Sequence, residues 1–145
     1  MDLRNDAARH WLVTTALAYL GTPYRWGGDD PSGFDCSGLV IESLRSVGLL
    51  ENVDLTADGL MKRFLPYQTP EPDCGRLVFL IGAEGRAVHV GICLDKWFMI
   101  EAGGGDGEVV DRDAAWRRNA FVKIRPLPSP GPRRKICDPF MSTKE

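Results

Sequence analysis

The stretch FDCSGLV, residues 34–40, places a cysteine at the point where a loop rich in glycine and proline turns into an amphipathic helix. Asp35 is a natural N-cap, so Cys36 is expected at the first helical position, where unpaired amides and the helix dipole favour a thiolate. Gly48 stands where a left-handed C-cap belongs. The pattern predicts a nucleophilic cysteine, with a buried structural cysteine as the alternative. The buried face of this helix is predicted from residues at helical spacing, which are Leu39, Val40, Ser43, Leu44 and Val47.

A cysteine nucleophile needs a base, and His89 is the serious candidate in the sequence. It lies in VHVGICL, residues 88–94, an expected strand in which Gly91 leaves room for a substrate or another backbone segment. The alternative is a core or edge histidine held by a hydrogen bond. His10, by contrast, fits a solvent-exposed position on the first helix. The sequence therefore predicts that His89 is the base.

Glu101 is the candidate for orienting His89, because it lies in the next expected strand. If a turn of three residues, or another odd number, is centred on Asp95, His89 and Glu101 face each other directly on one side of the sheet. A two-residue turn at positions 95–96 would instead pair His89 with Ala102. Glu101 would then lie on the opposite face, as a solvated edge carboxylate. The apolar neighbours of Glu101 favour the first register.

The loop GTPYRWGG, residues 21–28, contributes further candidates. In a functional interpretation, Tyr24 turns its hydroxyl toward the oxyanion, and the backbone amide of Cys36 is the second donor. In a structural interpretation, the loop is a tight connector, and Tyr24 and Trp26 cover the core. Asp35 has two compatible roles, as helix cap and as carboxylate partner for a cationic substrate group.

Length and composition are those of one folded domain, with 145 residues, 43% of them hydrophobic and 26% charged. A formal net charge of -2 gives no reason to expect nucleic acid or an anionic membrane as a partner. The four cysteines form no CxxC pair and there are two histidines, so no metal is expected. Residues 11–20 are too short an apolar stretch to cross a bilayer, and residues 1–10 lack the features of a secretory signal. The chain is therefore expected to be cytoplasmic as synthesised, without disulfide bonds.

Helical patterns precede strand-like patterns, which predicts an α+β domain with N-terminal helices packed on a central antiparallel sheet. The first helix is expected to run from a cap at Asp2 or Asn5 to about Leu20, and a short third helix is expected after Thr56. Residues 66–75 are expected to form a connector. Strands are expected at 76–81, 88–94, 97–102, 108–110 and 121–125, with a helical turn at 114–118.

The cysteines other than Cys36 have no predicted chemical role. Cys93 lies in an apolar strand and is expected in the core, whereas Cys74 lies in a turn. Cys137 lies in residues 126–145, a basic segment rich in proline that is expected to be a tail on the surface or disordered. The buried face of the first helix is expected to consist of Leu12, Val13, Ala16, Leu17 and Leu20.

Taken together, these motifs resemble those of the NlpC/P60 family of papain-like cysteine peptidases. The resemblance covers roughly residues 11–125 in the expected order and spacing. It implies a papain-like fold, with a single catalytic domain at residues 1–125. The matching segments are GTPYRWGG at 21–28, FDCSGLV at 34–40, GRLVFL at 75–80, HVGICL at 89–94 and MIEAGGG at 99–105.

The resemblance also implies roles for individual residues. Cys36 matches the family's nucleophile and His89 its base, while Tyr24 matches the tyrosine of the oxyanion site. The family's third catalytic position is usually a histidine, and Glu101 stands there; a carboxylate is a competent partner for a histidine. The aspartate and serine beside the family's cysteine hold the free amino end of the peptide. The residues expected to bind substrate are Tyr24, Trp26, Asp35 and Ser37.

The function implied is hydrolysis of peptidoglycan stem peptides, typically between γ-D-glutamate and a diamino acid, through a thioester acyl-enzyme and without a cofactor. One alternative is a non-catalytic phage tail or assembly component that retains the fold. Another is a related acyl-transfer enzyme acting on a non-wall amide. Short members of this kind resemble those of phage tail modules. Phage tail proteins are therefore one expected class of partner, with the peptidase virion-associated or delivered to the periplasm or cell wall by the tail. Cytoplasmic turnover of recycled stem peptides would suit the sequence as well.

Overall fold

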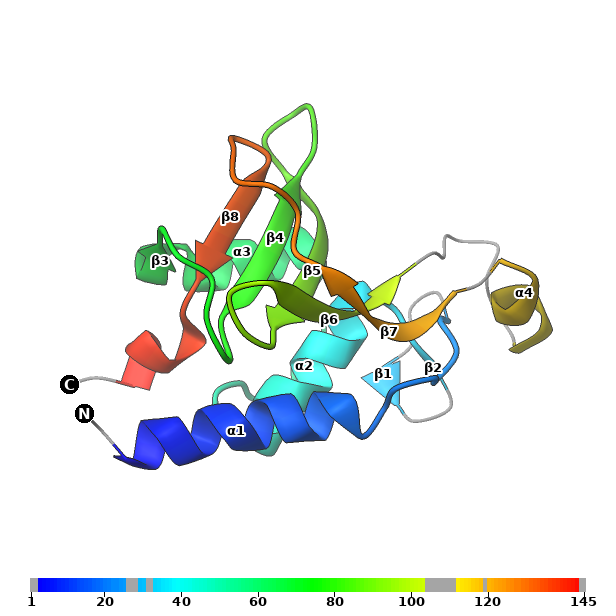
Figure 1. Cartoon of the computed structure of the whole chain (residues 1–145), viewed down its shortest axis with the longest axis horizontal. Helices are drawn as coiled ribbons and strands as arrows, with labels where there is room; N and C mark the ends of the chain where they lie inside the picture. Colours follow the sequence, from blue (N-terminus) through cyan, green and yellow to red (C-terminus); the bar gives the residue numbers. More distant parts are fainter. Residues whose placement is uncertain (1–2, 26–28, 31–32, 104–111, 119, 144–145) are drawn as a thin grey trace.

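The protein has an α+β fold in which helices lie against an antiparallel sheet (Figure 1), as the sequence predicted. The structure is a computed structural model, and it describes residues 3–25, 29–30, 33–103, 112–118 and 120–143. None of the helices in these segments combines the length and apolar character needed to cross a bilayer. The helices are α1 (Leu3–Leu17), α2 (Cys36–Ser46), α3 (Ala57–Phe64) and α4 (Arg112–Arg117), with short 3-10 helices η1 (Leu65–Tyr67) and η2 (Pro139–Thr143).

Six strands of the described chain form one sheet in the order β3-β8-β4-β5-β6-β7, and all neighbours are antiparallel. Four of the predicted strands are confirmed to within a residue or so at each end, whereas the strand predicted at 108–110 lies outside the described residues. The strands are β3 (Gln68–Thr69), β4 (Leu77–Ile81), β5 (Ala87–Cys93), β6 (Phe98–Gly103), β7 (Phe121–Pro126) and β8 (Arg134–Cys137). A separate pair, β1 (Asp29–Asp30) and β2 (Gly33–Phe34), precedes α2.

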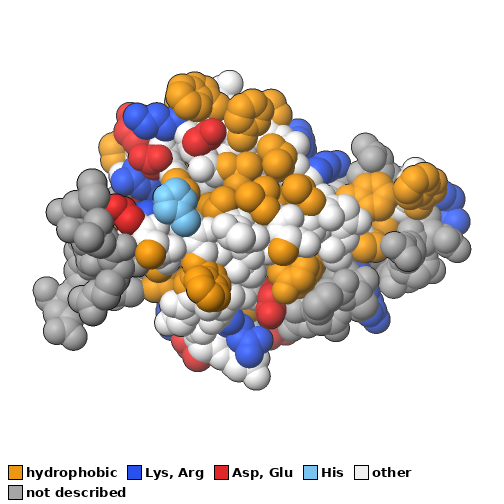
Figure 2. Space-filling view, turned by 60° about the horizontal axis from the view of Figure 1, so that its bottom comes forward, with side chains coloured by type: hydrophobic (Ala, Val, Ile, Leu, Met, Phe, Trp, Pro, Cys, Tyr) orange, Lys and Arg blue, Asp and Glu red, His pale blue; other side chains and the backbone are white. Residues whose placement is uncertain are grey.

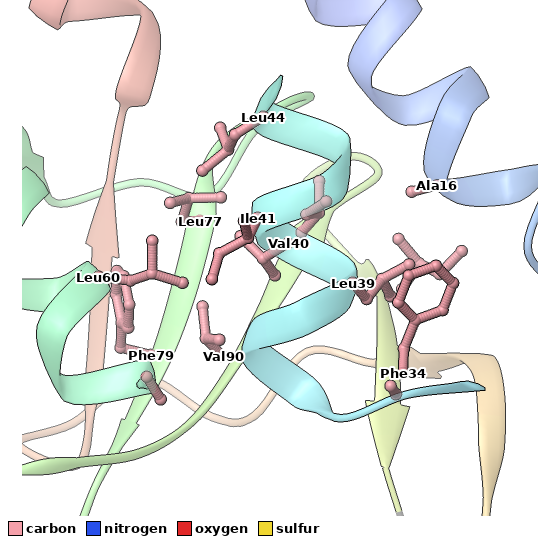
Figure 3. Close-up of a cluster of buried hydrophobic side chains, with 14 of the residues drawn as sticks. Ala16, Phe34, Leu39, Val40, Ile41, Leu44, Leu60, Leu77, Phe79 and Val90 are labelled. Atoms are coloured by element: carbon pink, nitrogen blue, oxygen red, sulfur yellow. The ribbon is translucent and has the colours of Figure 1, made fainter. Parts of the chain in front are cut away.

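Helix α2 lies between α1 and the sheet, because its side chains are apolar toward both neighbours (Figure 3). Leu39 lies near Ala16 of α1, whereas Ile41 lies near Leu77 of β4. All of these side chains are buried, and each large one contributes about 1.5–3 kcal/mol to folding. This packing fixes the start of α2 against the sheet. Some hydrophobic side chains stay exposed, and Figure 2 shows a group of them on the face that carries α1.

Helix α1 begins at Leu3, directly after Asp2, which is one of the two predicted caps, whereas its C-terminal end differs from the prediction. Asn5 lies inside the helix instead of capping it, and Asp2 lies outside the described residues. The helix ends before Leu20, which is 46% exposed and not part of the buried face. The amide of Gly21 donates a hydrogen bond of 2.9 Å to the carbonyl of Val122, so the chain leaves the helix to join β7.

The prediction of a surface or disordered tail after residue 125 is wrong. Strand β8 lies between β3 and β4, and Cys137 is fully buried. Four of the five prolines of this segment precede β8, and the strand itself carries the apolar pair Ile136 and Cys137. The predicted connector at 66–75 likewise contains β3, which pairs with β8.

A buried ion-pair cluster ties the C-terminal segment to the rest of the fold. Oδ2 of Asp138 accepts hydrogen bonds from Nη2 of Arg9 at 2.7 Å and from Nε of Arg76 at 3.3 Å. The guanidinium of Arg9 also lies 4.7 Å from the centre of the Phe140 ring, in cation–π geometry. The last described residues are therefore anchored to α1 and to the start of β4.

Candidate active site

Helix α2 begins at Cys36, as the sequence predicted. Oδ1 of Asp35 accepts hydrogen bonds from the amide of Gly38 at 2.7 Å and from Oγ of Ser37 at 3.2 Å, so Asp35 caps the helix. At the other end, Gly48 adopts a left-handed φ of 76° and closes the helix, also as predicted. The half-buried Cys36 is thus held on the first turn, beside backbone amides that have no partner within the helix.

The imidazole of His89 interacts with both Cys36 and Glu101. Nε2 of His89 hydrogen-bonds to Oε2 of Glu101, and interaction with the nearby Cys36 side chain also raises the pKa of the ring. The Glu101 side chain is only 3% exposed, and that of His89 is partly buried. The structure therefore brings together a thiol, an imidazole and a carboxylate from α2, β5 and β6.

The electrostatics of this cluster favour an ion pair between His89 and Glu101. Burial alone would lower the pKa of His89, but hydrogen bonds and attraction to Cys36 and Glu101 outweigh it and raise the pKa from 6.5 to about 9. Burial would raise the pKa of Glu101, but the hydrogen bond to His89 and the positive charges of His89 and Arg125 hold it below the ordinary 4.5. At neutral pH the imidazole is therefore protonated and the carboxylate is charged.

The turn between β5 and β6 contains three residues, 95–97, because the amide of residue 94 bonds to the carbonyl of residue 98 at 2.8 Å. The prediction of an odd-numbered turn is confirmed, but its centre is Lys96 and not Asp95. The reason lies in the side chain of Asp95, whose Oδ1 accepts hydrogen bonds from the amides of Trp97 at 2.7 Å and Phe98 at 2.8 Å. This arrangement makes Asp95 the first residue of the turn.

The observed register places His89 and Glu101 diagonally on one face of the sheet. Ile92 pairs with Ile100, so continuing the pairing along the strands puts Glu101 across from Gly91. The prediction of a shared face is confirmed, whereas the prediction of direct opposition is wrong by two residues, because Glu101 lies across from Gly91 and not from His89. Gly91 allows the strands to approach closely, since a Cβ there would lie 3.0 Å from the carbonyl oxygen of Ile100.

The segment around Tyr24 lies against the residues that precede α2. The amide of Arg25 donates to the carbonyl of Phe34 at 3.0 Å, and the amide of Phe34 donates to the carbonyl of Pro23 at 3.1 Å. Tyr24 is buried, next to the strand that leads into Cys36. Its role as an oxyanion donor stays a prediction, and Trp26 lies outside the described residues.

Arg125 is the neighbour of the site that the sequence analysis missed. Its Nη1 lies 3.0 Å from Oε1 of Glu101. Lys123 and Arg125 are two residues apart on β7 and therefore share one face of the sheet. This alternation was the one feature of the sequence that could have predicted cationic side chains beside a neighbouring strand. The pairing of β6 with β7 could not be predicted from a short turn, because residues 104–120 separate the two strands in the sequence.

The other thiols lie apart from this cluster. Cys93 and Cys137 are fully buried, and burial raises their pKa to about 12 and about 11 respectively. The core position predicted for Cys93 is confirmed. Cys74 is half-buried, and burial together with the charge of Asp73 raises its pKa above 9.0. Within the described segments, no group of three or more His, Cys, Asp or Glu residues is arranged to hold a metal ion.

A thiol on the first turn of a helix, beside an imidazole held by a buried carboxylate, is the arrangement of a cysteine peptidase. A model of the NlpC/P60 family matches residues 21–125, so this chain belongs to the NlpC/P60 family. Its homologues include cysteine peptidases and endopeptidases of the bacterial cell wall.

Individual relatives support the same assignment. The chain is 36% identical over 117 residues to the bifunctional muramidase/DL-endopeptidase CwlT of Bacillus subtilis, a match covering 78% of this chain and 35% of that protein. It is 38% identical over 90 residues to the murein DD-endopeptidase MepH of Escherichia coli, covering 59% and 33% respectively. The chain therefore spans about a third of the length of these curated relatives.

Solved structures show the same fold. The peptidoglycan hydrolase RipB from Mycobacterium tuberculosis superposes with a TM-score of 0.71 at 23% identity, over 94% of this chain and 67% of that chain. The predicted α+β architecture of the family is thus confirmed for the described part of the chain.

Proposed function

We propose that this protein is a cysteine endopeptidase that hydrolyses an amide bond in peptidoglycan stem peptides. The single observation that carries the proposal is the imidazole of His89, which hydrogen-bonds to the buried Glu101 and interacts with the Cys36 side chain on the first turn of α2. Membership of a family of peptidoglycan endopeptidases supports the substrate class.

In the first half of the proposed reaction, the Cys36 sulfur attacks the carbonyl carbon of the scissile amide. The oxyanion that forms accepts hydrogen bonds from the Tyr24 hydroxyl and the Cys36 amide. The carbon–nitrogen bond then breaks while His89 gives its proton to the leaving amine. The products of this half are a free amine and a thioester on Cys36.

In the second half, His89 takes a proton from a water molecule whose oxygen attacks the thioester. The carbon–sulfur bond breaks, the new carboxylic acid leaves, and the Cys36 thiolate and the His89 imidazolium are restored. Glu101 stays ionised throughout, because its task is to hold the ring and stabilise the imidazolium.

The proposed substrate site adjoins the nucleophile. Asp35 and Ser37 flank Cys36, and the negative charge of Asp35 suits the free amino end of a stem peptide. Tyr24 and Trp26 are proposed to line the same site. The scissile bond is proposed to be the one between γ-D-glutamate and the diamino acid, because the relative named DL-endopeptidase matches more of this chain than the one named DD-endopeptidase.

The proposal is tested by incubating the protein with purified peptidoglycan fragments and identifying the products by mass spectrometry. Wild-type protein and the matched control Cys74→Ala should release the same products, whereas Cys36→Ala should release none. Cleavage by Cys36→Ala at the wild-type rate would overturn the mechanism. Products cut at a different bond would overturn the choice of substrate but not the chemistry.

Origin in the cytoplasm and delivery to the cell wall by a phage tail stay predictions. They are tested by following the tagged protein in fractions of an infected or induced culture. A protein found only in the cytoplasm throughout would contradict the proposed delivery.

A further inference from the structure

The buried carboxylate of Glu101 has a second cationic neighbour besides His89. His89 binds Oε2, while Nη1 of Arg125 lies 3.0 Å from Oε1. The Glu101 side chain is 3% exposed and that of Arg125 is 59% exposed. Strand β6 lies between β5 and β7, and each oxygen of its Glu101 carboxylate contacts a cationic side chain from a different neighbouring strand.

The contact with Arg125 is an ion pair in its geometry. No described residue donates an aligned hydrogen bond to Oε1, although this oxygen is buried and the guanidinium lies at ion-pair distance. A buried carboxylate oxygen without a counter-charge is unfavourable, so the cation has an electrostatic task at this position.

The strand register and a glycine position the Glu101 carboxylate between His89 and Arg125. Glu101 pairs across the strands with Lys123, so Arg125 is its diagonal neighbour on the same face of the sheet. Gly103 keeps the space for the carboxylate open, because a Cβ there would lie 3.1 Å from Oε2 of Glu101. The side chain is therefore confined between a glycine, an imidazole and a guanidinium.

We propose that Arg125 is a positioning residue, which holds one oxygen of Glu101 so that the other oxygen points at His89. Its effect on catalysis rests on the proposed function, whereas its effect on the carboxylate does not. Arg125 acts through Glu101 and His89 on the thiol of Cys36, and it makes no contact with the reacting atoms.

The charged and titratable groups around Glu101 determine how a substitution of Arg125 changes the pKa of its carboxyl group. Among the described residues they are His89 on β5 and Lys123 and Arg125 on β7, with Cys36 of α2 interacting with the same imidazole. Because the charge of Arg125 helps to hold the pKa of Glu101 low, removing it raises that pKa.

Kinetics of Arg125→Gln and Arg125→Lys, each made in the wild-type and in the Glu101→Gln background, test the proposal. Arg125→Gln should lower kcat about tenfold with little change in KM, and Arg125→Lys should restore most of the loss. In the Glu101→Gln background, Arg125→Gln should cause no further loss. An equal loss in both backgrounds, or a raised KM at unchanged kcat, would overturn the proposal by indicating a structural role or a substrate contact.

A titration of the Glu101 carboxyl carbon by 13C NMR separates this proposal from the proposed function, since it needs no activity. The resonance is assigned by its loss in Glu101→Gln. Its pKa should rise in Arg125→Gln but stay near the wild-type value in Arg125→Lys and in the exposed control Arg133→Gln. No rise would overturn the proposal even if the protein proves to be a peptidase. Arg125→Met is examined in the same way if the Gln variant does not fold.

Discussion

Glu101 and Asp138 are buried to nearly the same degree, with 3% and 2% of their side chains exposed, and each lies between two cationic side chains. Asp138 binds Arg9 and Arg76, whose guanidinium groups carry permanent charge. Glu101 instead binds an imidazole, which can gain and lose a proton. The comparison separates a carboxylate that holds the fold together from one that we propose stabilises a catalytic imidazolium.

Substitution of Asp138 should give the largest energetic effect. Asp138→Asn should lower the free energy of unfolding by about 3 kcal/mol, because it leaves two partly buried guanidinium groups without their counter-charge. Urea denaturation measures the change, with the exposed Asp54→Asn as control. The folded fraction should keep its activity. A cost below about 1 kcal/mol would mean that the cluster is not the anchor of the C-terminal segment.

Substitution of Glu101 should reduce activity strongly and stability less, whereas substitution of Asp138 should reduce stability and leave activity intact. Glu101→Gln should lower kcat/KM about 100-fold, since the imidazolium loses the negative charge that stabilises it. Its cost in unfolding free energy should be smaller than that of Asp138→Asn. Kinetics with a stem-peptide substrate measure the effect, and Glu51→Gln on the surface is the control. Full activity of Glu101→Gln would show that Glu101, like Asp138, has a structural role only.

The features that could be predicted from the sequence depend on neighbouring residues. The start of α2 follows from the side chain of Asp35, which caps it, and its end follows from Gly48. That His89 and Glu101 share a face follows from an odd number of residues in one short turn. The centre of the turn lies one residue beyond the predicted one, which shifts the pairing by two residues. The cause is Asp95, whose side chain accepts hydrogen bonds from the amides of Trp97 and Phe98.

The features that could not be predicted depend on pairings between distant parts of the chain. Strand β8 enters the sheet between β3 and β4, although both precede it by more than fifty residues. Its short apolar pair follows a run of prolines, so composition alone suggested a tail. Arg125 was missed for the same reason, since no turn relates β7 to β6.

The raised pKa of His89 predicts how pH affects the protein. Because the folded pKa of about 9 lies above the ordinary 6.5, the interactions of His89 stabilise the fold fully below pH 6.5 and are lost as pH rises through 9. The kcat/KM should likewise fall on the alkaline side with a midpoint near 9, as the imidazolium loses its proton.

An NMR titration of His89, in protein labelled at histidine and with His10 assigned by His10→Gln, measures the interaction of Cys36, His89 and Glu101 most directly. We expect a pKa of about 9 for His89 in the wild type and lower values in both Cys36→Ala and Glu101→Gln, because each variant removes one partner of the ring. A His89 that titrates at 6.5 or below, or whose pKa is unchanged by both substitutions, would show that Cys36 and Glu101 do not stabilise its imidazolium.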